Sequence, residues 1–253
     1  PHPRFRGTSG IGVYGDFVHE LDDSVGRVLD ALERSGQRDD TIVILASDNG
    51  ATEHHRAVER VCYDGHYANG PFRGSKTEVF EGGHRIPLIA RWPDRIPAGS
   101  ECDHLLALTD LLATCAGLAG VPLPAGASPD GHDCSASLLD PTGATPARET
   151  LVHDSFFETV YALRHGDWKL IMDQHPGGLA ARDRLLPRSG PPGMLFNLAE
   201  DPGETENRYR NEPGIVNELT DRFLAIRTET FDWPVALFEG STNNGSCARN
   251  SPA

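Results

Sequence analysis

Apolar positions in the first part of the chain follow a helical rhythm. From residue 16 to residue 35 they recur every three or four residues, which predicts an amphipathic helix. Asp16 is a possible cap at its start and Gly36 a stop after its end. The apolar positions that set this rhythm are Phe17, Leu21, Val25, Val28, Leu29 and Leu32.

Short apolar runs follow this helix and change the rhythm. Residues 41–47 and 86–92 are rich in β-branched and other apolar side chains, so each predicts a buried strand. Residues 50–82 between them are polar and rich in glycine, which indicates a long loop. Residues 105–119 predict a second helix, closed by Gly120. The order helix, strand, loop, strand, helix is typical of an α/β sheet with covered faces.

The second half of the chain has a different pattern of apolar and turn residues. A connector rich in Pro and Gly runs from about residue 119 to residue 147. Short strands separated by turn residues and a final helix then predict a small α+β domain with an antiparallel sheet. We therefore divide the chain into a first domain with its connector, a small domain and a polar tail: 1–147, 148–232 and 233–253. The predicted strands are 151–155, 160–164, 168–172 and 194–198, and the predicted helix is 215–227.

Charge and cysteine content exclude several classes of protein. The formal net charge of −14 argues against a general binder of nucleic acid or anionic membranes. No apolar run approaches the length of a membrane span. The five cysteines are odd in number and form no C-x-x-C pair, which argues against a disulfide framework or a cysteine zinc site. Cys115, inside the second predicted helix, is expected to pack in the core.

The end of the first predicted strand carries the strongest chemical signal. Asp48 and Asn49 follow that strand directly, and Gly50 allows the chain to turn away. Ligands of open α/β sheets bind beyond the carboxyl ends of strands, and adjacent carboxylate and amide oxygens suit Ca²⁺ or Mg²⁺. Taken alone, the same residues are better explained by an ordinary Asp-Asn-Gly turn without a metal.

The following motifs favour the metal site. S-D-N-G at 47–50 is followed by R-G-S-K at 73–76 and by E-G-G-H-R-I-P at 81–87. In this order the chain resembles the type I sulfatases of the alkaline phosphatase superfamily. The resemblance implies an alkaline-phosphatase-like sheet with helices on both faces, of which these residues hold an incomplete part. Further matches are F-R-G-x-S-G-x-G-x-Y-G-D at 5–16, L-T-D-L-x-A-T at 108–114 and L-x-x-D-P-x-E-x-x-N at 198–207.

The resemblance assigns roles residue by residue. Asp48 and Asn49 become ligands of one Ca²⁺ ion, and Lys76 contacts the sulfate group. A metal ion and a compact ammonium group together stabilise the charge that develops as an S–O bond breaks. His66 is expected to contact substrate or to help the leaving group as an acid, and His153 to reach the site from the small domain.

Other residues of the third motif are expected to be structural. The paired glycines Gly82 and Gly83 serve a tight turn into the strand, and Arg85 holds the loop through a buried ion pair. His84 is expected to be a structural histidine with satisfied hydrogen bonds.

The nucleophile of the resembled enzymes has no counterpart in these residues. They use a formylglycine made from Cys or Ser in C/S-x-P-S-R, and no such motif occurs among the 253 residues. Two further metal-binding aspartates of the family are also without counterpart. We therefore expect these residues to be a C-terminal portion of a sulfuric ester hydrolase that has no turnover by itself. The resemblance also implies a periplasmic or secreted location.

Two alternatives stay open at this point. One is a phosphodiesterase or phosphonate hydrolase of the same superfamily, which usually places His after the Asp to bind Zn²⁺ or Mn²⁺. Asn49 at that position favours calcium and sulfate. The other is a non-catalytic relative that binds sulfated ligands. The expected partner is a small sulfated sugar or aryl sulfate, with no nucleic acid.

Overall fold

The structure of the chain is a computed structural model, which describes residues 1–52, 62–63, 65–156, 160–178 and 190–230. The predicted polar tail, 233–253, lies outside the described residues. A 3₁₀ turn, η1 (Pro3–Phe5), leads into the long helix α1 (Gly12–Arg34). No helix of the described ranges is both long and apolar enough to cross a membrane.

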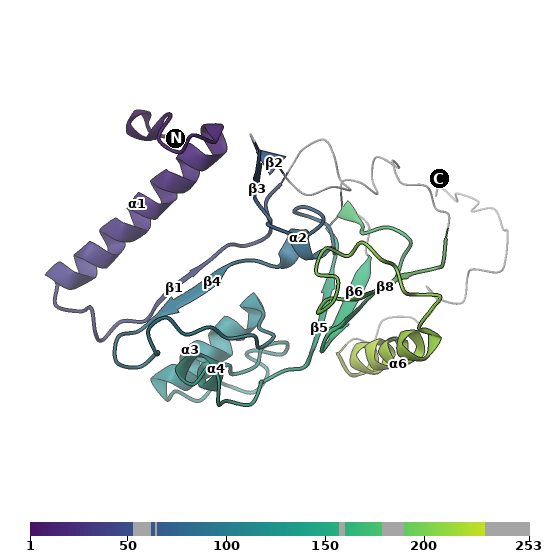
Figure 1. Ribbon diagram of the computed structural model, residues 1–253. Coiled ribbons are helices and arrows are strands. Elements are labelled where there is room, and N and C mark those ends of the chain that lie inside the picture. The colour runs from purple at the N-terminus through teal and green to yellow at the C-terminus, as the bar shows by residue number, and fades with distance from the viewer. Residues whose placement is uncertain (53–61, 64, 157–159, 179–189, 231–253) are drawn as a thin grey trace, which may run out of the picture.

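Two strands form the centre of the first part of the chain. β1 (Val43–Ala46) and β4 (Leu88–Arg91) pair antiparallel, with Ala46 opposite Leu88. Both predicted strands are therefore confirmed. Because the strands are antiparallel, the exit of β1 and the entry of β4 lie at the same end of the pair. In Figure 1, α1 stands on one side of this pair, and the helices α3 (Leu111–Ala119) and α4 (Ser135–Leu139) lie on the other.

The loop between the two strands contains short elements of its own. The strands β2 (Cys62–Tyr63) and β3 (His66–Tyr67) pair antiparallel, and α2 (Glu81–His84) is a single helical turn before β4. The paired glycines that we expected in a turn lie inside α2.

The first helix differs from the prediction at its start. α1 begins at Gly12, so the expected cap, Asp16, lies inside its first turns. The Asp16 carboxylate is buried and accepts hydrogen bonds from the amides of Gly7 (2.7 Å) and Ser9 (3.0 Å). Asp16 therefore fixes the F-R-G-x-S-G loop against the helix. The predicted stop at Gly36 is confirmed by its left-handed φ of 70°.

The second helix, α3, also differs from the prediction. A 3₁₀ turn, η2 (Leu108–Asp110), precedes α3, and Gly120 ends α3 in the left-handed conformation. Cys115 is exposed on α3, so the prediction that it packs in the core is wrong. Helical periodicity locates an apolar helix but does not say which of its sides is covered.

The buried side of this region is organised by Asp110. Its carboxylate accepts from the amides of Ala107 (2.8 Å) and His132 (2.9 Å) and forms a buried ion pair with Arg148. The hydroxyl of Thr114 accepts from the amide of Cys134 at 3.0 Å. The polar residues of the L-T-D-L-x-A-T motif thus fix the connector that follows α3.

The small domain is a four-stranded antiparallel sheet with one covering helix. The strand order is β5-β6-β7-β8, as the predicted strands require, and α6 covers the sheet. Leu163, Leu170 and Leu195 point to α6, while their neighbours Ala162, Ile171 and Phe196 point to the other face. The bounds are β5 (Thr150–Asp154), β6 (Tyr161–His165), β7 (Trp168–Ile171), β8 (Met194–Asn197) and α6 (Pro213–Thr230).

The far face of this sheet is covered by the loop of the first domain. Val79 and Phe80 are fully buried and share one hydrophobic cluster with Ala162, Ile171 and Phe196. Burying a side chain of this size contributes roughly 1.5–3 kcal/mol. The loop that bears the second and third motifs is therefore packed onto a rigid sheet.

Candidate functional site

The S-D-N-G loop leaves β1 with its polar groups partly organised. The Ser47 hydroxyl donates to the Asn49 carbonyl at 2.7 Å, and the Asn49 side-chain amide donates to the Gly50 carbonyl at 3.0 Å. Asp48 is exposed. Because the side-chain NH₂ group of Asn49 is engaged as a donor, the side-chain oxygen Oδ1 is the atom of Asn49 that can act as a metal ligand.

Main-chain hydrogen bonds join this loop to the other two motifs. The Gly50 amide donates to the Gly83 carbonyl at 2.9 Å, and the Lys76 amide donates to the Ala51 carbonyl at 3.0 Å. Asn69 bridges the same region, since its side chain accepts from the Ala51 amide at 2.8 Å and donates to the Gly74 carbonyl at 3.1 Å. The structure therefore brings residues 48–51, 73–76 and 81–84 together.

Glycines allow this close approach of three backbone segments. A Cβ atom on Gly50 would lie 1.8 Å from the Gly82 carbonyl oxygen. A Cβ on Gly82 would lie 2.5 Å from the carbonyl oxygen of Arg73, and one on Gly83 would lie 2.2 Å from that of Glu78. No side chain fits at these positions, so the glycines of the motifs are a packing requirement.

The residue after Lys76 has an unusual backbone. Thr77 has φ 83°, in the left-handed region that a β-branched residue rarely adopts. Its carbonyl accepts from the Phe156 amide at 3.2 Å, which ties it to the end of β5. Backbone conformations of this kind cost about 1–3 kcal/mol and persist where surrounding contacts impose them. The Lys76 side chain itself is exposed.

A buried ionic cluster lies under the third motif. The Lys169 ammonium, from β7, lies 2.9 Å from a carboxylate oxygen of Glu81 and 2.9 Å from one of Glu204. All three side chains are at most 1% exposed. The other carboxylate oxygen of Glu204 accepts from the Glu81 amide at 2.6 Å. We did not single out Lys169 from the sequence, because a lysine in a strand ordinarily points to solvent.

The pKa values of this cluster follow from burial and from the shared ammonium group. Burial raises the pKa of Glu81, but Lys169 and nearby arginines outweigh it and hold the value below its usual range. Burial and the neighbouring Glu81 raise the pKa of Glu204, although Lys169 opposes them. One Glu204 oxygen accepts from the Glu81 amide, and the other faces the Lys169 ammonium at 2.9 Å.

Arg85 and His84 extend the cluster outward. Arg85 forms the expected ion pair with buried Glu81 at 3.4 Å, but its own side chain is 44% exposed. His84 Nε2 lies 3.1 Å from the Lys169 ammonium, which can only donate. His84 is thus a structural histidine, as expected, and burial holds its pKa well below the usual value.

His153 reaches this loop from β5 in the small domain. Its ring packs on the ring of His84 with centroids 3.8 Å apart, and its Nε2 lies 3.3 Å from the Val79 carbonyl. Burial lowers the pKa of His153 to about 3, so the ring is neutral at pH 7. Its predicted contact with substrate stays a prediction, and a neutral ring would make it a hydrogen-bonding group.

His66 lies on the short strand β3, away from this cluster. Its ring stacks on that of Tyr14 in α1 with centroids 6.0 Å apart. The strand leads directly into Asn69, which bonds to residues 51 and 74. His66 is therefore connected to the site through three residues of chain, and its role in catalysis stays a prediction.

The donor set at the end of β1 fits part of a calcium shell. Asp48 and Asn49 offer a carboxylate and an amide oxygen, both hard ligands of the kind that Ca²⁺ prefers. Ca²⁺ takes six to eight oxygen ligands, however. Among the described residues, no group of three or more His, Cys, Asp or Glu side chains could hold a metal ion. These two residues can therefore supply only a part of the coordination.

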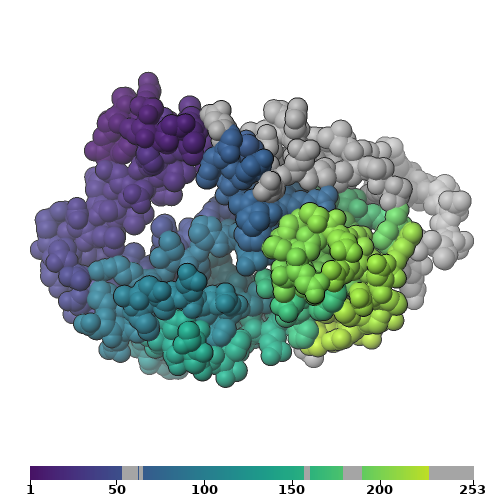
Figure 2. Space-filling view, viewed as in Figure 1, coloured from purple at the N-terminus to yellow at the C-terminus, as the bar shows by residue number. Residues whose placement is uncertain are grey.

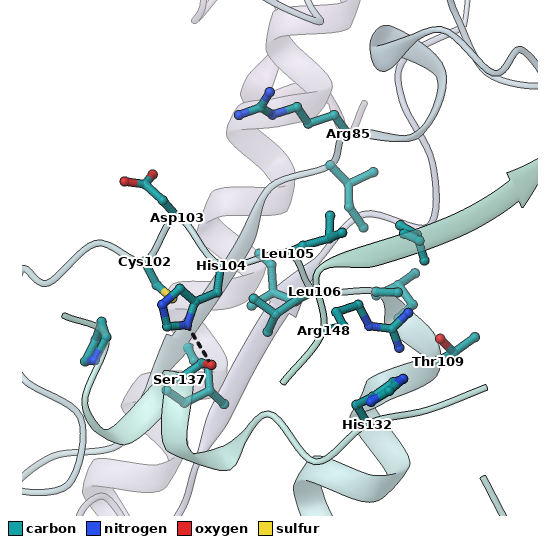
Figure 3. Close-up of a pocket in the computed structure, with 18 of the residues that line it drawn as sticks. Arg85, Cys102, Asp103, His104, Leu105, Leu106, Thr109, His132, Ser137 and Arg148 are labelled. Carbon is teal, nitrogen blue, oxygen red and sulfur yellow. Dashed lines mark hydrogen bonds between the residues drawn. The ribbon is translucent and has the colours of Figure 1, made fainter. Parts of the chain in front are cut away.

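A large cavity of about 1770 Å³ lies beside the site. Asp48 and His153 border it, whereas Asn49, His66 and Lys76 do not. Figure 3 shows its interior, where Arg85, Asp103 and Arg148 surround the apolar side chains of Leu105 and Leu106. The space-filling view also shows a hollow between α1 and the rest of the molecule (Figure 2).

A serine and a histidine meet in this cavity without forming a nucleophilic pair. His104 Nδ1 lies 2.9 Å from the Ser137 hydroxyl (Figure 3). Ser137 is only 1% exposed, so a substrate could not reach its oxygen. Nor does His104 form an ion pair with a carboxylate in the part of the chain that the structure describes, and such a partner orients a catalytic histidine.

Comparisons with known proteins agree on one family. The sulfatase family model matches residues 3–121. The N-acetylgalactosamine-6-O-sulfatase of Bacteroides thetaiotaomicron is 32% identical over 232 residues, which cover 90% of this chain and 44% of that protein. Human arylsulfatase A is 34% identical over 235 residues, which cover 86% of this chain and 44% of that protein.

Solved structures give the same result. A sulfatase from Pseudoalteromonas superposes with a TM-score of 0.71 at 30% identity and covers 90% of this chain and 45% of that one. A structure from work on glycosaminoglycan metabolism by Bacteroides thetaiotaomicron superposes with a TM-score of 0.75 at 30% identity. The match covers 90% of this chain and 47% of that one. The likeness confirms the predicted fold class. The chain spans about half the length of the relatives it matches.

The sequence match and the structural match extend over the same residues that carry the ordered motifs of the site. The chain therefore belongs to the sulfatase family.

Proposed function

We propose that the protein containing this chain is a sulfuric ester hydrolase that removes sulfate from a sulfated sugar. The observation that carries the proposal is the hydrogen-bonded junction of the S-D-N-G loop with the loop of Lys76. A relative that matches 90% of the chain is an N-acetylgalactosamine-6-O-sulfatase, which supports a sugar substrate. No observation specifically supports the phosphodiesterase alternative.

In this proposal Asp48 and Asn49 are two of the ligands of one Ca²⁺ ion. When bound, the ion supplies Lewis-acid stabilisation of negative charge on the sulfate oxygens. Asp48 is exposed at the exit of β1, where its carboxylate can bind an ion without a large cost of burial. The rigid contact between Gly50 and Gly83 fixes the backbone from which both ligands project.

Lys76 is assigned to the sulfate group. Its amide donates to the Ala51 carbonyl, three residues after Asp48, so its backbone is held next to the loop of the proposed metal ligands. A lysine is a compact point charge with three donors, which suits one oxygen of a small tetrahedral anion. Lys76 thus binds and orients the ester and stabilises the charge that develops on it.

The remaining assignments concern the leaving group and the nucleophile. We assign His66 to substrate contact and to proton donation to the leaving alcohol, and His153 to substrate contact as a neutral hydrogen-bonding group. The proposed nucleophile of the whole protein is a formylglycine, which these 253 residues do not encode in the C/S-x-P-S-R form. A periplasmic or secreted location is proposed with it.

Calcium titration of residues 1–253 by isothermal calorimetry tests the proposal. With only two side-chain ligands known, we expect weak binding, with a Kd of about 1 mM, at the weak end of protein calcium sites. Asp48→Asn should abolish it, while Arg27→Ala on the exposed side of α1 should not change it. Calcium binding that survives Asp48→Asn would contradict the metal assignment.

The sulfate assignment is tested in the presence of calcium. Line broadening of N-acetylgalactosamine 6-sulfate in proton NMR should require Lys76 and disappear in Lys76→Ala. Equal broadening by the wild-type chain and the variant would contradict the role of Lys76. Unsulfated N-acetylgalactosamine is the matched control ligand.

A further inference from the structure

The buried ionic cluster touches the loop of the site at two separate points. Glu204 accepts from the Glu81 amide at 2.6 Å through its side chain, and its own carbonyl accepts from the Arg73 guanidinium at 3.0 Å. Arg73 and Glu81 are the first residues of the second and third motifs. One residue of the small domain therefore holds both motifs of the first domain.

These two anchors continue to the proposed ligands through single hydrogen bonds. The Arg73 carbonyl accepts from the Gly82 amide at 2.7 Å, and the Gly83 carbonyl accepts from the Gly50 amide at 2.9 Å. The Lys76 amide donates to the Ala51 carbonyl. The path from Glu204 to the loop of Asp48 thus begins with two side-chain contacts and continues through main-chain hydrogen bonds.

The backbone at both ends of this path is held in an uncommon conformation. Glu204 has φ 52° and Thr77 has φ 83°, and only one other non-glycine residue, Asp94, has a positive φ among the described residues. Glu204 is 0% exposed. A fully buried glutamate and a left-handed backbone each cost free energy, so the contacts around Glu204 must impose this arrangement.

We propose that Glu204, held by Lys169, is a positioning residue that sets the placement of the S-D-N-G loop relative to Lys76. The inference rests on the proposed function, since it is the geometry of the calcium and sulfate groups that Glu204 would control. Glu204 touches neither group. It acts through Arg73 and Glu81, and the Lys169 ammonium, 2.9 Å from its carboxylate, orients that group.

The substitution that tests this role is Glu204→Gln, which preserves volume. The Glu204 carboxylate presents one oxygen to the Glu81 amide and the other to the Lys169 ammonium, whereas a carboxamide has one acceptor oxygen and must point its NH₂ group at one of these two groups. One of the two contacts is therefore lost. The matched control is Asn207→Ala, three residues along the same motif. The Asn207 side chain bonds to the backbone of Gly193, Leu195 and Tyr209 and so lies in the small domain, not on the 73–83 loop.

Amide hydrogen exchange of residues 1–253, followed by NMR, is the direct measurement. In Glu204→Gln the amides of Gly50 and Lys76 should exchange at least ~10-fold faster, while the amides between β6 and β7 change much less. Asn207→Ala should show no such local difference. Uniform acceleration across all these amides would overturn the inference, because it would mean that Glu204 only adds global stability.

Calcium affinity gives the second readout and separates this inference from the proposed function. Glu204→Gln should weaken calcium binding at least ~3-fold, with Asn207→Ala unchanged even if it lowers the melting temperature as much. If the wild-type chain binds no calcium, the metal assignment fails while the exchange experiment still decides the role of Glu204. Should Glu204→Gln not fold, Arg73→Met, which has no donor for the Glu204 carbonyl, should show the same faster exchange at the amides of Gly50 and Lys76. Unchanged exchange at these amides would overturn the inference.

Discussion

At the residue scale, the site depends on positions where no side chain fits. A Cβ atom on Gly50 would overlap the Gly82 carbonyl oxygen, and that atom belongs to a backbone segment fixed by Arg73 and Glu81. We expect Gly50→Ala to lower the free energy of unfolding in urea by about 3 kcal/mol or more, because neither backbone can move without breaking other bonds. Gly26→Ala, in α1 with open space around it, is the control and should raise stability by up to about 1 kcal/mol. An equal effect of the two substitutions would refute the packing argument.

A second residue-scale prediction concerns Glu78, which is 3% exposed between the second and third motifs. Burial raises the pKa of Glu78 to about 8, although the Ser75 amide and Arg73 oppose the shift. The folded state therefore binds a proton that the unfolded state releases, and stability falls as pH rises from about 4.5 to about 8.

The test is Glu78→Gln, which stays neutral at every pH and can still accept from the Ser75 amide. Its unfolding free energy should lack this decline, so that at pH 8 it exceeds that of the unmodified chain by roughly 2–5 kcal/mol. Urea unfolding at pH 5, 6.5 and 8 measures the difference. A parallel pH dependence of the two proteins would show that Glu78 is ionised throughout.

At the scale of elements, the strand β7 and the turn α2 are joined by Lys169 and Glu81. Removing the ammonium group takes away the cation that two buried carboxylates share, so Lys169→Met should cost about 3–5 kcal/mol of unfolding free energy. Arg208→Ala, which breaks exposed ion pairs with Glu200 and Glu206 in the same domain, should have a much smaller effect. A small effect of Lys169→Met in thermal or urea unfolding would mean that the cluster relaxes into solvent.

The elements themselves could largely be predicted from the sequence, because each depends on local periodicity. Both strands of the first domain, all four strands of the small domain and the final helix lie within a few residues of their predicted bounds. The errors arose where tertiary contacts decide: Asp16 bonds to a loop instead of capping a helix, and Cys115 faces outward. The ion pair between Lys169 and Glu81 joins residues 88 positions apart, and no local sequence pattern predicts it.

In the candidate site, too, the sequence predicted what local motifs encode and missed what contacts between distant residues decide. The motifs identified Asp48, Asn49 and Lys76 as neighbours, and the structure joins their loops through Gly50 and Ala51. Their roles stay predictions. The sequence did not identify Glu204 as the residue that holds these loops, because a glutamate after Asp-Pro-Gly looks like part of a solvated turn.

At the scale of the whole molecule, the proposed function gives this chain only part of a reaction centre. Sulfate ester hydrolysis needs a nucleophile, a complete metal shell and a group that binds sulfate. Asp48 and Asn49 offer two oxygen ligands and Lys76 one ammonium, while C/S-x-P-S-R occurs nowhere in the 253 residues. We therefore expect purified residues 1–253 to bind calcium yet show no sustained hydrolysis of an aryl sulfate, measured as released phenol over a day with calcium present. Linear, calcium-dependent turnover that Asp48→Asn abolishes would show instead that these residues supply a nucleophile of their own. Turnover that survives Asp48→Asn would point to a contaminating sulfatase, which a repeat with independently purified protein would remove.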